Sequence, residues 1–315
     1  MFRSFTDMQT ELARLRAAGD GGAAVRALIE QHLDAFPLHF GFTYQMLAQL
    51  QAEAGERERA LDTLARALSK GARYRAGWLM GDARLASVRD EPRFTALVRQ
   101  ASAAYDEAAA AAKPHLTFAM PDTLPDAFGY PLLMVLHGNG SNAKETAPYW
   151  TSMADKGWVV AVPQSSEVGA SPDAYTWNDR ERTAKELDLH FDRVKRATEI
   201  DTSRVVLGGF SMGATQAIAF ALTKRFTIRG FIAVAAWLPH VREFRGLIEG
   251  GAAKMLRAYI TVGSDDPSCA GARELVEVMT QHKIRAKLDE RPGLGHSYPD
   301  DMDATVETAL AFATK

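Results

Sequence analysis

The sequence predicts an all-α helical domain over residues 1–112, followed by an α/β domain with a mostly parallel sheet flanked by helices over residues 113–315. Three observations predict this organisation. Apolar residues recur at three- and four-residue steps in the first part, which is typical of helices packed on one face. In the second part, short β-branched runs alternate with helical segments, which indicates crossover units. The length of 315 residues also accommodates two domains.

The first part contains glycine- and proline-rich breaks between segments that are each long enough for one helix. These breaks are Gly19–Gly22, Pro37, Gly55, Gly71 and Asp90–Pro92. Because the connections are short, successive helices are expected to form antiparallel hairpins.

One hairpin has a more specific pattern, with small residues where two helices pack closest and large residues between them. Its residues are Tyr44, Leu47, Ala48, Ala60, Leu64 and Ala67. This pattern resembles the tetratricopeptide repeat. The repeat's late proline is replaced by Ala72, and Trp78 lies one 34-residue period after Tyr44 in a second unit that otherwise matches poorly. The resemblance implies a short, degenerate tetratricopeptide-like array, a class that commonly binds peptides.

The second part begins after Lys113-Pro114, because proline disfavours helix in the residue before it. Strands are expected at residues 132–136, 158–162, 204–207, 231–235, 257–262 and 284–289, with an antiparallel edge strand at 116–119. Amphipathic helices are expected near residues 144–156, 180–198, 212–224, 270–282 and 301–313.

Composition excludes several classes of function. The formal net charge of −2 and the pI near 6.5 leave no basic excess for nucleic acid or anionic membrane. The single cysteine, Cys269, excludes an intramolecular disulfide. The first residues lack the apolar core of a signal peptide, and the longest apolar runs, such as 231–238, are too short for a membrane span. We therefore expect a cytoplasmic protein.

The segment Gly209-Phe210-Ser211-Met212-Gly213 lies between the expected strand at 204–207 and a small-residue helix. This is the G-x-S-x-G pattern in the strand–turn–helix setting that gives it chemical meaning. The turn is so tight that the serine backbone is expected to be strained, with its hydroxyl projecting from the sheet edge. Ser211 is thus the candidate nucleophile, whereas the alternative is a serine that only makes a turn.

A serine needs a base and a group that orients the base. Asp265 and Asp266 follow the expected strand at 257–262, and His296 follows the next strand after a glycine-rich turn. The carboxyl ends of parallel strands meet at one edge of a sheet, so both loops are expected beside Ser211. The order nucleophile, acid, histidine is that of α/β-hydrolases. The residue pattern alone leaves the choice between the two aspartates open.

Four motifs in order resemble the carboxylesterase/phospholipase branch of the α/β-hydrolases, near the dienelactone hydrolases. They are Leu136–Gly140, Gly209–Gly213, Gly263–Asp266 and Gly295-His296, and the resemblance covers about residues 130–315. It implies that Asp266 is the acid, because the family's acid stands three residues after the glycine. It also implies an oxyanion hole formed by the backbone N–H groups of Asn139 and Met212. His137 is interpreted as a structural residue of the loop.

Trp237 follows a strand on the same edge and resembles the family's pocket-lining segment. Trp177 lies in a loop between a strand and a helix, where it could line the substrate pocket or only pack the loop. No cap domain fits in the roughly twenty residues after Trp237. The histidines lack metal-ligand spacing, so no metal and no cofactor are expected.

These features predict a carboxylic-ester hydrolase that forms an acyl-enzyme on Ser211, with a small-molecule ester as substrate. One alternative is a thioesterase or peptidase using the same three residues, since all three reactions share a tetrahedral intermediate. Another is a scaffold in which residues 1–112 bind a protein partner or mediate self-association, with the hydrolase domain as a passenger.

Overall fold

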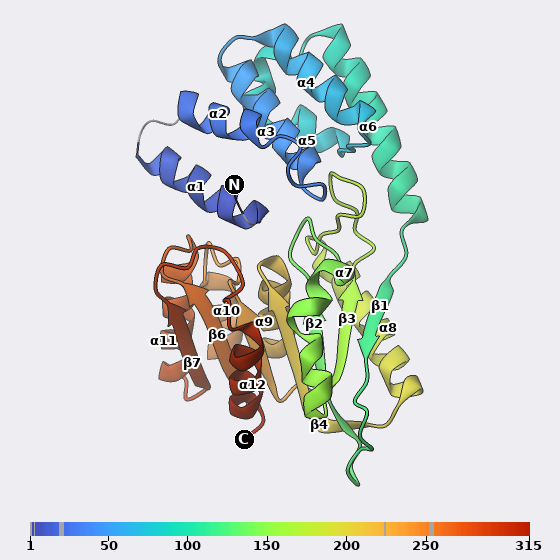
Figure 1. Cartoon of the computed structure of the whole chain (residues 1–315), viewed down its shortest axis with the longest axis vertical. Coiled ribbons are helices and arrows are strands. Elements are labelled where there is room, and N and C mark those ends of the chain that lie inside the picture. The colour runs from blue at the N-terminus through green and yellow to red at the C-terminus, as the bar shows by residue number, and fades with distance from the viewer. Residues whose placement is uncertain (1, 3, 19–21, 224, 252–254) are drawn as a thin grey trace. The chain divides into compact units, whose positions relative to one another are not determined.

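The computed structural model describes residues 2, 4–18, 22–223, 225–251 and 255–315, which divide into two compact units (Figure 1). The helical unit comprises the described residues up to Lys113 together with Ser166–Thr176. The α/β unit comprises Pro114–Ser165 and the described residues from Trp177 to Lys315. The first division lies one residue from the predicted boundary, but assignment of the segment 166–176 to the helical unit was not predicted.

The helical unit is built from short helices separated at the expected glycines and prolines. They are α1 (Phe5–Ala17), α2 (Ala23–Gln31), α3 (Phe40–Glu53), α4 (Arg57–Ser69), α5 (Ala76–Met80), η1 (Ala83–Val88) and α6 (Pro92–Ala111). Gly55 and Gly71 end α3 and α4 with positive φ angles, which glycine adopts without steric cost. The predicted break at 19–22 lies mainly outside the described residues.

The α/β unit contains a seven-stranded sheet in the order β1-β3-β2-β4-β5-β6-β7 (Figure 1). The strands are β1 (His115–Ala119), β2 (Tyr130–Leu136), β3 (Val159–Gln164), β4 (Ile200–Phe210), β5 (Gly230–Val234), β6 (Arg257–Gly263) and β7 (Arg285–Arg291). All neighbouring pairs are parallel except β1 with β3, which is antiparallel. The mostly parallel sheet and its antiparallel edge strand are therefore confirmed.

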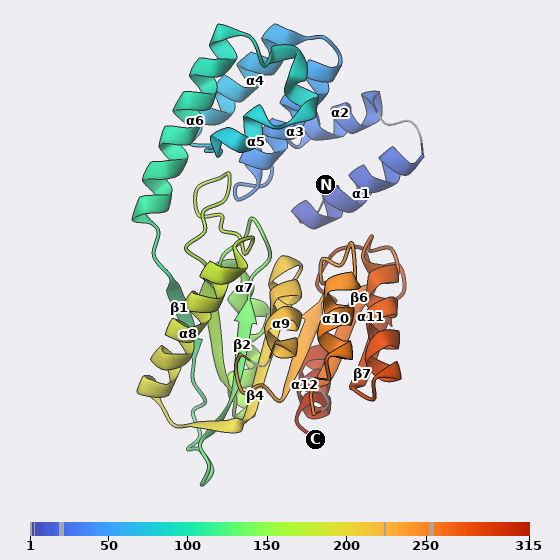
Figure 2. The same ribbon diagram turned by 180° about the vertical axis from the view of Figure 1, so that it is seen from behind.

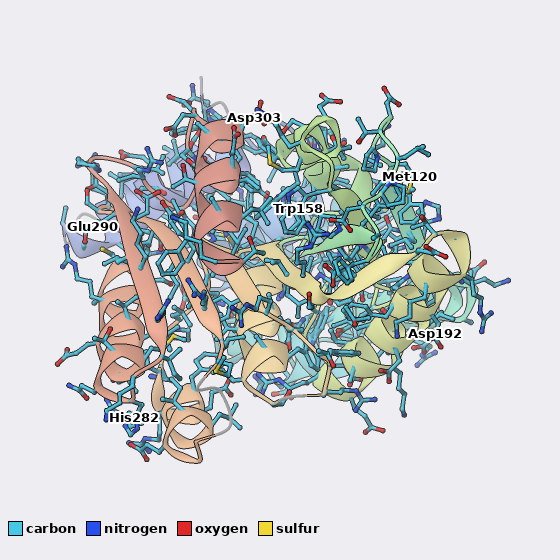
Figure 3. All side chains as sticks on the ribbon, turned by 90° about the horizontal axis from the view of Figure 1, so that it is seen from below. Met120, Trp158, Asp192, His282, Glu290 and Asp303 are labelled. Atoms are coloured by element: carbon cyan, nitrogen blue, oxygen red, sulfur yellow. The ribbon has the colours of Figure 1, made fainter. Side chains whose placement is uncertain are left out.

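Both faces of the sheet are covered, because successive side chains of a buried strand point to opposite sides. Leu132 and Met134 of β2 pack in the cluster formed by α8 (Arg180–Ala197), α9 (Met212–Leu222), α10 (Arg242–Glu249) and α11 (Cys269–Gln281). Leu133 and Val135 pack on the other face, toward α7 (Ala143–Thr146) and α12 (Met302–Ala313). Figure 2 shows α8, α9, α10 and α11 in front of the sheet, and Figure 3 shows Asp303 of α12 on the opposite side from Asp192 and His282.

Two segments differ from the prediction. The stretch expected as one helix near 144–156 is broken into α7, η2 (Ala147–Tyr149) and η3 (Thr151–Lys156), because Pro148 lacks an N–H and its ring obstructs a continuous helix. The short helix α10 was not predicted. Among the described residues, every helix is too short or too polar to cross a bilayer.

Candidate active site

Ser211 occupies the tight turn between β4 and α9 with φ 53° and ψ −122°, a backbone conformation that residues other than glycine rarely adopt. The predicted strain is therefore confirmed. A Cβ on Gly209 would lie 2.5 Å from the Gly213 backbone, and one on Gly213 would collide with the carbonyls of Leu136 and His137. Both glycines are required because other backbone fills the space that a side chain would take.

The backbone of Ser211 is tied to the neighbouring strand and helix. Its N–H donates to the Val234 carbonyl at 3.1 Å, and its own carbonyl accepts from the N–H groups of Thr215 at 3.1 Å and Trp237 at 3.2 Å. Met212 is the first residue of α9, where N–H groups have no partner within the helix and the helix dipole favours negative charge. The turn therefore presents the serine oxygen at a site suited to a developing anion.

The structure brings Ser211, His296 and Asp266 into one hydrogen-bonded chain. His296 Nε2 lies 2.9 Å from Ser211 Oγ, and His296 Nδ1 lies 2.8 Å from Asp266 Oδ2. The three residues come from the loops that follow β4, β6 and β7. The acid and histidine loops are in direct contact, because a Cβ on Gly263 would collide with the Leu294 carbonyl. Residues distant in sequence thus meet at the carboxyl edge of the sheet.

The two candidate acids have different environments. The Asp266 side chain is buried, and its second oxygen, Oδ1, accepts from the Ser268 N–H at 2.7 Å. Asp265 is exposed and accepts from the Ser264 hydroxyl at 2.9 Å. Only Asp266 contacts the imidazole. The sequence analysis did not identify Ser268 as a partner of the acid. The contact is an Asx turn, in which an aspartate accepts a hydrogen bond from the backbone N–H two residues later.

The loop after β2 passes beside the nucleophile. A Cβ on Gly138 would lie 3.5 Å from Ser211 Cβ and 3.0 Å from the Phe210 ring, so the backbone next to Asn139 lies against the serine. Met212 lies on the other side of Ser211 in the chain, at the start of α9. This arrangement places the two expected oxyanion donors in segments that both border the serine.

The Asn139 side chain is fixed by the chain that precedes α8. Its Oδ1 accepts from the Trp177 N–H at 2.9 Å, and its Nδ2 donates to Asn178 Oδ1 at 2.8 Å. The Trp177 carbonyl in turn accepts from Gln216 Nε2 of α9 at 2.7 Å. No motif indicated Asn178 or Gln216, because their contacts depend on the fold rather than on local sequence.

His137 is fully buried, and both ring nitrogens are occupied. Nε2 accepts from the Ser165 N–H at 3.3 Å, so the ring proton is on Nδ1, which donates to the Gly138 carbonyl at 2.8 Å. Burial lowers the pKa of His137 to about 4, partly opposed by the bond to Gly138. A neutral imidazole with both ring nitrogens hydrogen-bonded supports the interpretation of His137 as a structural residue.

The depressed pKa of His137 predicts a loss of stability in acid. The unfolded chain binds a proton near pH 6.5 but the folded protein only near pH 4, so the unfolded state holds more protons between these values and stability falls as pH falls. One such group contributes a slope of up to about 1.4 kcal/mol per pH unit. Urea unfolding of wild type and His137→Gln at pH 7 and pH 5 measures it.

The Gln variant is expected to be less stable at pH 7 but to lose less stability on acidification. His39 and His190, whose pKa values burial also lowers to about 4, titrate equally in both proteins and so cancel in the comparison. Equal pH dependence of the two proteins would contradict a neutral buried His137.

The two tryptophans expected at the substrate pocket differ in the exposure of their side chains. Trp237 has 44% of its surface exposed, and its backbone is fixed by its bond to Ser211 and by the Thr215 hydroxyl, which donates to its carbonyl at 2.7 Å. Trp177 is fully buried, with its ring 4.8 Å from that of His137. Its assignment as a substrate-binding side chain is therefore corrected: a ring without exposed surface packs the loop, whereas Trp237 is available to a ligand.

The mostly parallel sheet with flanking helices fits the α/β-hydrolase fold, with a serine on the turn after a central strand and the acid and histidine on later loops. Residues 181–313 match the phospholipase/carboxylesterase family, a segment that includes Ser211, Asp266 and His296. Among the described residues, no three His, Cys, Asp or Glu side chains gather as metal ligands.

Two proteins with assigned activities match short segments of the sequence. The chain is 34% identical over 86 residues to a bifunctional acetylxylan esterase/xylanase of Neocallimastix patriciarum, covering 26% of this chain. It is 30% identical over 89 residues to an acyl-protein thioesterase 1 of Mycosarcoma maydis, covering 28% of this chain. The chain covers 12% and 33% of the length of these two proteins.

One similar solved structure matches over almost the whole length of both chains. An uncharacterized protein from Bacillus cereus is 25% identical with a TM-score of 0.55, and the match covers 99% of each chain. The similarity therefore includes the helical unit as well as the α/β unit.

Proposed function

We propose that this protein is a serine hydrolase that cleaves carboxylic esters. Ser211 Oγ attacks the ester carbonyl while His296 Nε2 takes its proton, and Asp266 stabilises the resulting imidazolium. The N–H groups of Met212 and Asn139 would bind the oxyanion of the tetrahedral intermediate. The imidazolium then gives its proton to the departing alcohol, leaving an acyl group on Ser211. Water, deprotonated by His296, releases the carboxylic acid and restores the serine.

The observation that carries this proposal is the hydrogen-bonded chain from Ser211 through His296 to Asp266. Each polar atom of the imidazole is used, and the buried carboxylate has a second partner in the Ser268 N–H. Burying these polar groups costs free energy unless each is hydrogen-bonded. A serine that only makes a turn would not need such an arrangement. Hydrolysis of p-nitrophenyl acetate and butyrate by the purified protein tests the proposal.

A thioester substrate is the second candidate, favoured by the similarity to an acyl-protein thioesterase. Esters and thioesters share the tetrahedral intermediate, so the same residues would act on both. Comparing kcat/KM for acyl p-nitrophenyl esters, acyl thioesters and aminoacyl anilides of matched chain length distinguishes an esterase from a thioesterase or peptidase.

Trp237 is proposed to line the acyl or alcohol pocket. Loss of roughly half of an indole's contact area corresponds to about 1–2 kcal/mol. Trp237→Ala is therefore expected to raise KM for p-nitrophenyl butyrate by about tenfold with little change in kcat, as for loss of uniform binding. Phe128→Ala is the control, since Phe128 is an exposed aromatic side chain just before β2, at the opposite end of that strand from the loop that carries Asn139. Unchanged KM values across a series of acyl chains would remove Trp237 from the pocket.

The helical unit is proposed to be tetratricopeptide-like around the α3–α4 hairpin. Its support is the complete burial of Tyr44, Ala48, Ala60 and Ala67, which fill the positions where paired helices of such repeats meet. The second predicted unit has weaker support, because Trp78 at the position equivalent to Tyr44 is 37% exposed.

A further inference from the structure

The loop between β3 and α8, residues 166–176, is part of the helical unit and is bound there by Arg73. The Arg73 backbone N–H donates to the Ala170 carbonyl at 3.0 Å. Its Nε donates to the Gly169 carbonyl at 3.1 Å and its Nη2 to the Ser171 carbonyl at 3.0 Å. One residue thus satisfies three consecutive carbonyls, which fixes both the position and the orientation of the loop backbone.

Other contacts within the helical unit strengthen this attachment. The Gly41 N–H donates to Ser171 Oγ at 2.9 Å, and a Cβ on Gly41 would lie 2.5 Å from the Ala170 carbonyl oxygen. The backbone of α3 therefore touches the loop directly. Arg75 Nη2 lies 3.4 Å from Oε1 of Glu167, whose side chain is only 2% exposed. A buried carboxylate needs such a partner, so this ion pair also keeps the loop in place.

Both ends of the loop continue into residues that hold the loop after β2 in the α/β unit, which carries His137 and the expected oxyanion donor Asn139. At one end, the Ser165 N–H donates to His137 Nε2. At the other end, the Trp177 N–H donates to Asn139 Oδ1, the Trp177 carbonyl accepts from Gln216, and the indole lies against the His137 ring. The segment that Arg73 fixes is thus covalently continuous with the groups that position residues 137 and 139.

We propose that the helical unit positions the oxyanion donor through this loop, and that Arg73 is the positioning residue. This inference rests on the proposed function. A donor acts on charge that develops in the transition state, so a small displacement of Asn139 weakens catalysis more than substrate binding. The helical unit is therefore assigned the role of preorganising the site, whether or not it also binds a partner.

Arg73→Ala is the test, with kcat and KM for p-nitrophenyl acetate and the inhibition constant of an aryl trifluoromethyl ketone as readouts. Misplacement of a catalytic group by about 1 Å can cost about 100-fold, so we expect kcat to fall by about 10- to 100-fold with KM changed less than about twofold. The ketone forms a tetrahedral adduct with Ser211 whose oxyanion uses the same donors. Its inhibition constant should therefore rise by the same factor as kcat falls.

Arg26→Ala is the matched control, because it removes an arginine of the same unit that pairs with Glu30 and Glu56 and has no contact with the loop. It is expected to leave kcat and the inhibition constant unchanged. Arg73→Lys retains the backbone bond and the charge but not the planar fork, and an intermediate loss is expected. It also replaces Arg73→Ala if that variant does not fold.

Hydrogen exchange of the Trp177 amide gives a readout independent of activity. Protection should fall in the Arg73 variants and remain in Arg26→Ala. Folded Arg73 variants with wild-type kcat, ketone affinity and Trp177 protection would overturn the inference, as would equal losses in Arg26→Ala. If the wild-type protein hydrolyses no ester or thioester, the proposed function fails, whereas the exchange measurement still decides whether Arg73 holds the loop.

Discussion

Ser211→Ala is expected to lower kcat for p-nitrophenyl acetate by roughly 10⁶-fold, to the level of background hydrolysis. The substitution removes the oxygen that lies 2.9 Å from His296 Nε2, and an imidazole without a nucleophile cannot form the acyl-enzyme. KM has little meaning at such rates, so the comparison uses enzyme-dependent product release at saturating substrate. Wild-type protein should also be modified by a fluorophosphonate at residue 211, as measured by mass spectrometry of the peptide.

The control for this variant is Ser203→Ala, which changes a serine on the same strand. Ser203 donates to Asp201 near the start of β4 and lies away from the turn that carries Ser211. We expect wild-type turnover and no fluorophosphonate modification at residue 203. Wild-type turnover in Ser211→Ala would show that another group performs the chemistry and would end the proposed mechanism.

The positions of Ser211 and His296 could be predicted because each is marked by local sequence, whereas the choice of Asp266 over Asp265 rested on the family resemblance. Gly209 and Gly213 are required by close backbone approach, and the glycines before Asp266 and His296 mark the turns that follow strands. The alternation of β-branched runs with helices then fixes a parallel sheet, whose carboxyl ends share one edge. Local patterns and one topological rule were enough to bring Ser211, His296 and the Asp265–Asp266 pair to one edge of the sheet, but they did not choose between the two aspartates.

The packing of residues 166–176 in the helical unit could not be predicted for the opposite reason. Arg73 binds backbone carbonyls, which every residue has, so the loop sequence carries no mark of its partner. The burial of Trp177 is hidden in the same way, because a tryptophan near an active site is equally compatible with a pocket wall and with a packed loop. By contrast, Pro148 was a visible signal for the broken helix near 144–156.

Asp266→Asn is expected to lower kcat by about 10⁴-fold while leaving the fold intact. The reason lies in the two hydrogen bonds of this side chain: Oδ1 accepts from the Ser268 N–H, and Oδ2 faces His296 Nδ1. An asparagine amide has one acceptor and one donor group. If its oxygen stays on the Ser268 N–H, its NH₂ group faces His296 and donates to Nδ1. The ring proton is then forced onto Nε2, which can no longer accept a proton from Ser211.

Asp265→Asn provides the matched control at the adjacent position. Asp265 is exposed and bonded to the Ser264 hydroxyl, so the same loss of charge one residue away should change kcat less than about threefold, in keeping with the small effects of exposed charges. Both variants are measured at pH 7 and 8 with p-nitrophenyl acetate, and thermal unfolding checks that each is folded. Equal losses in the two variants would mean that the negative charge of the loop, rather than the tautomer imposed on His296, governs the rate. Such a result would remove Asp266 from its role as the orienting acid.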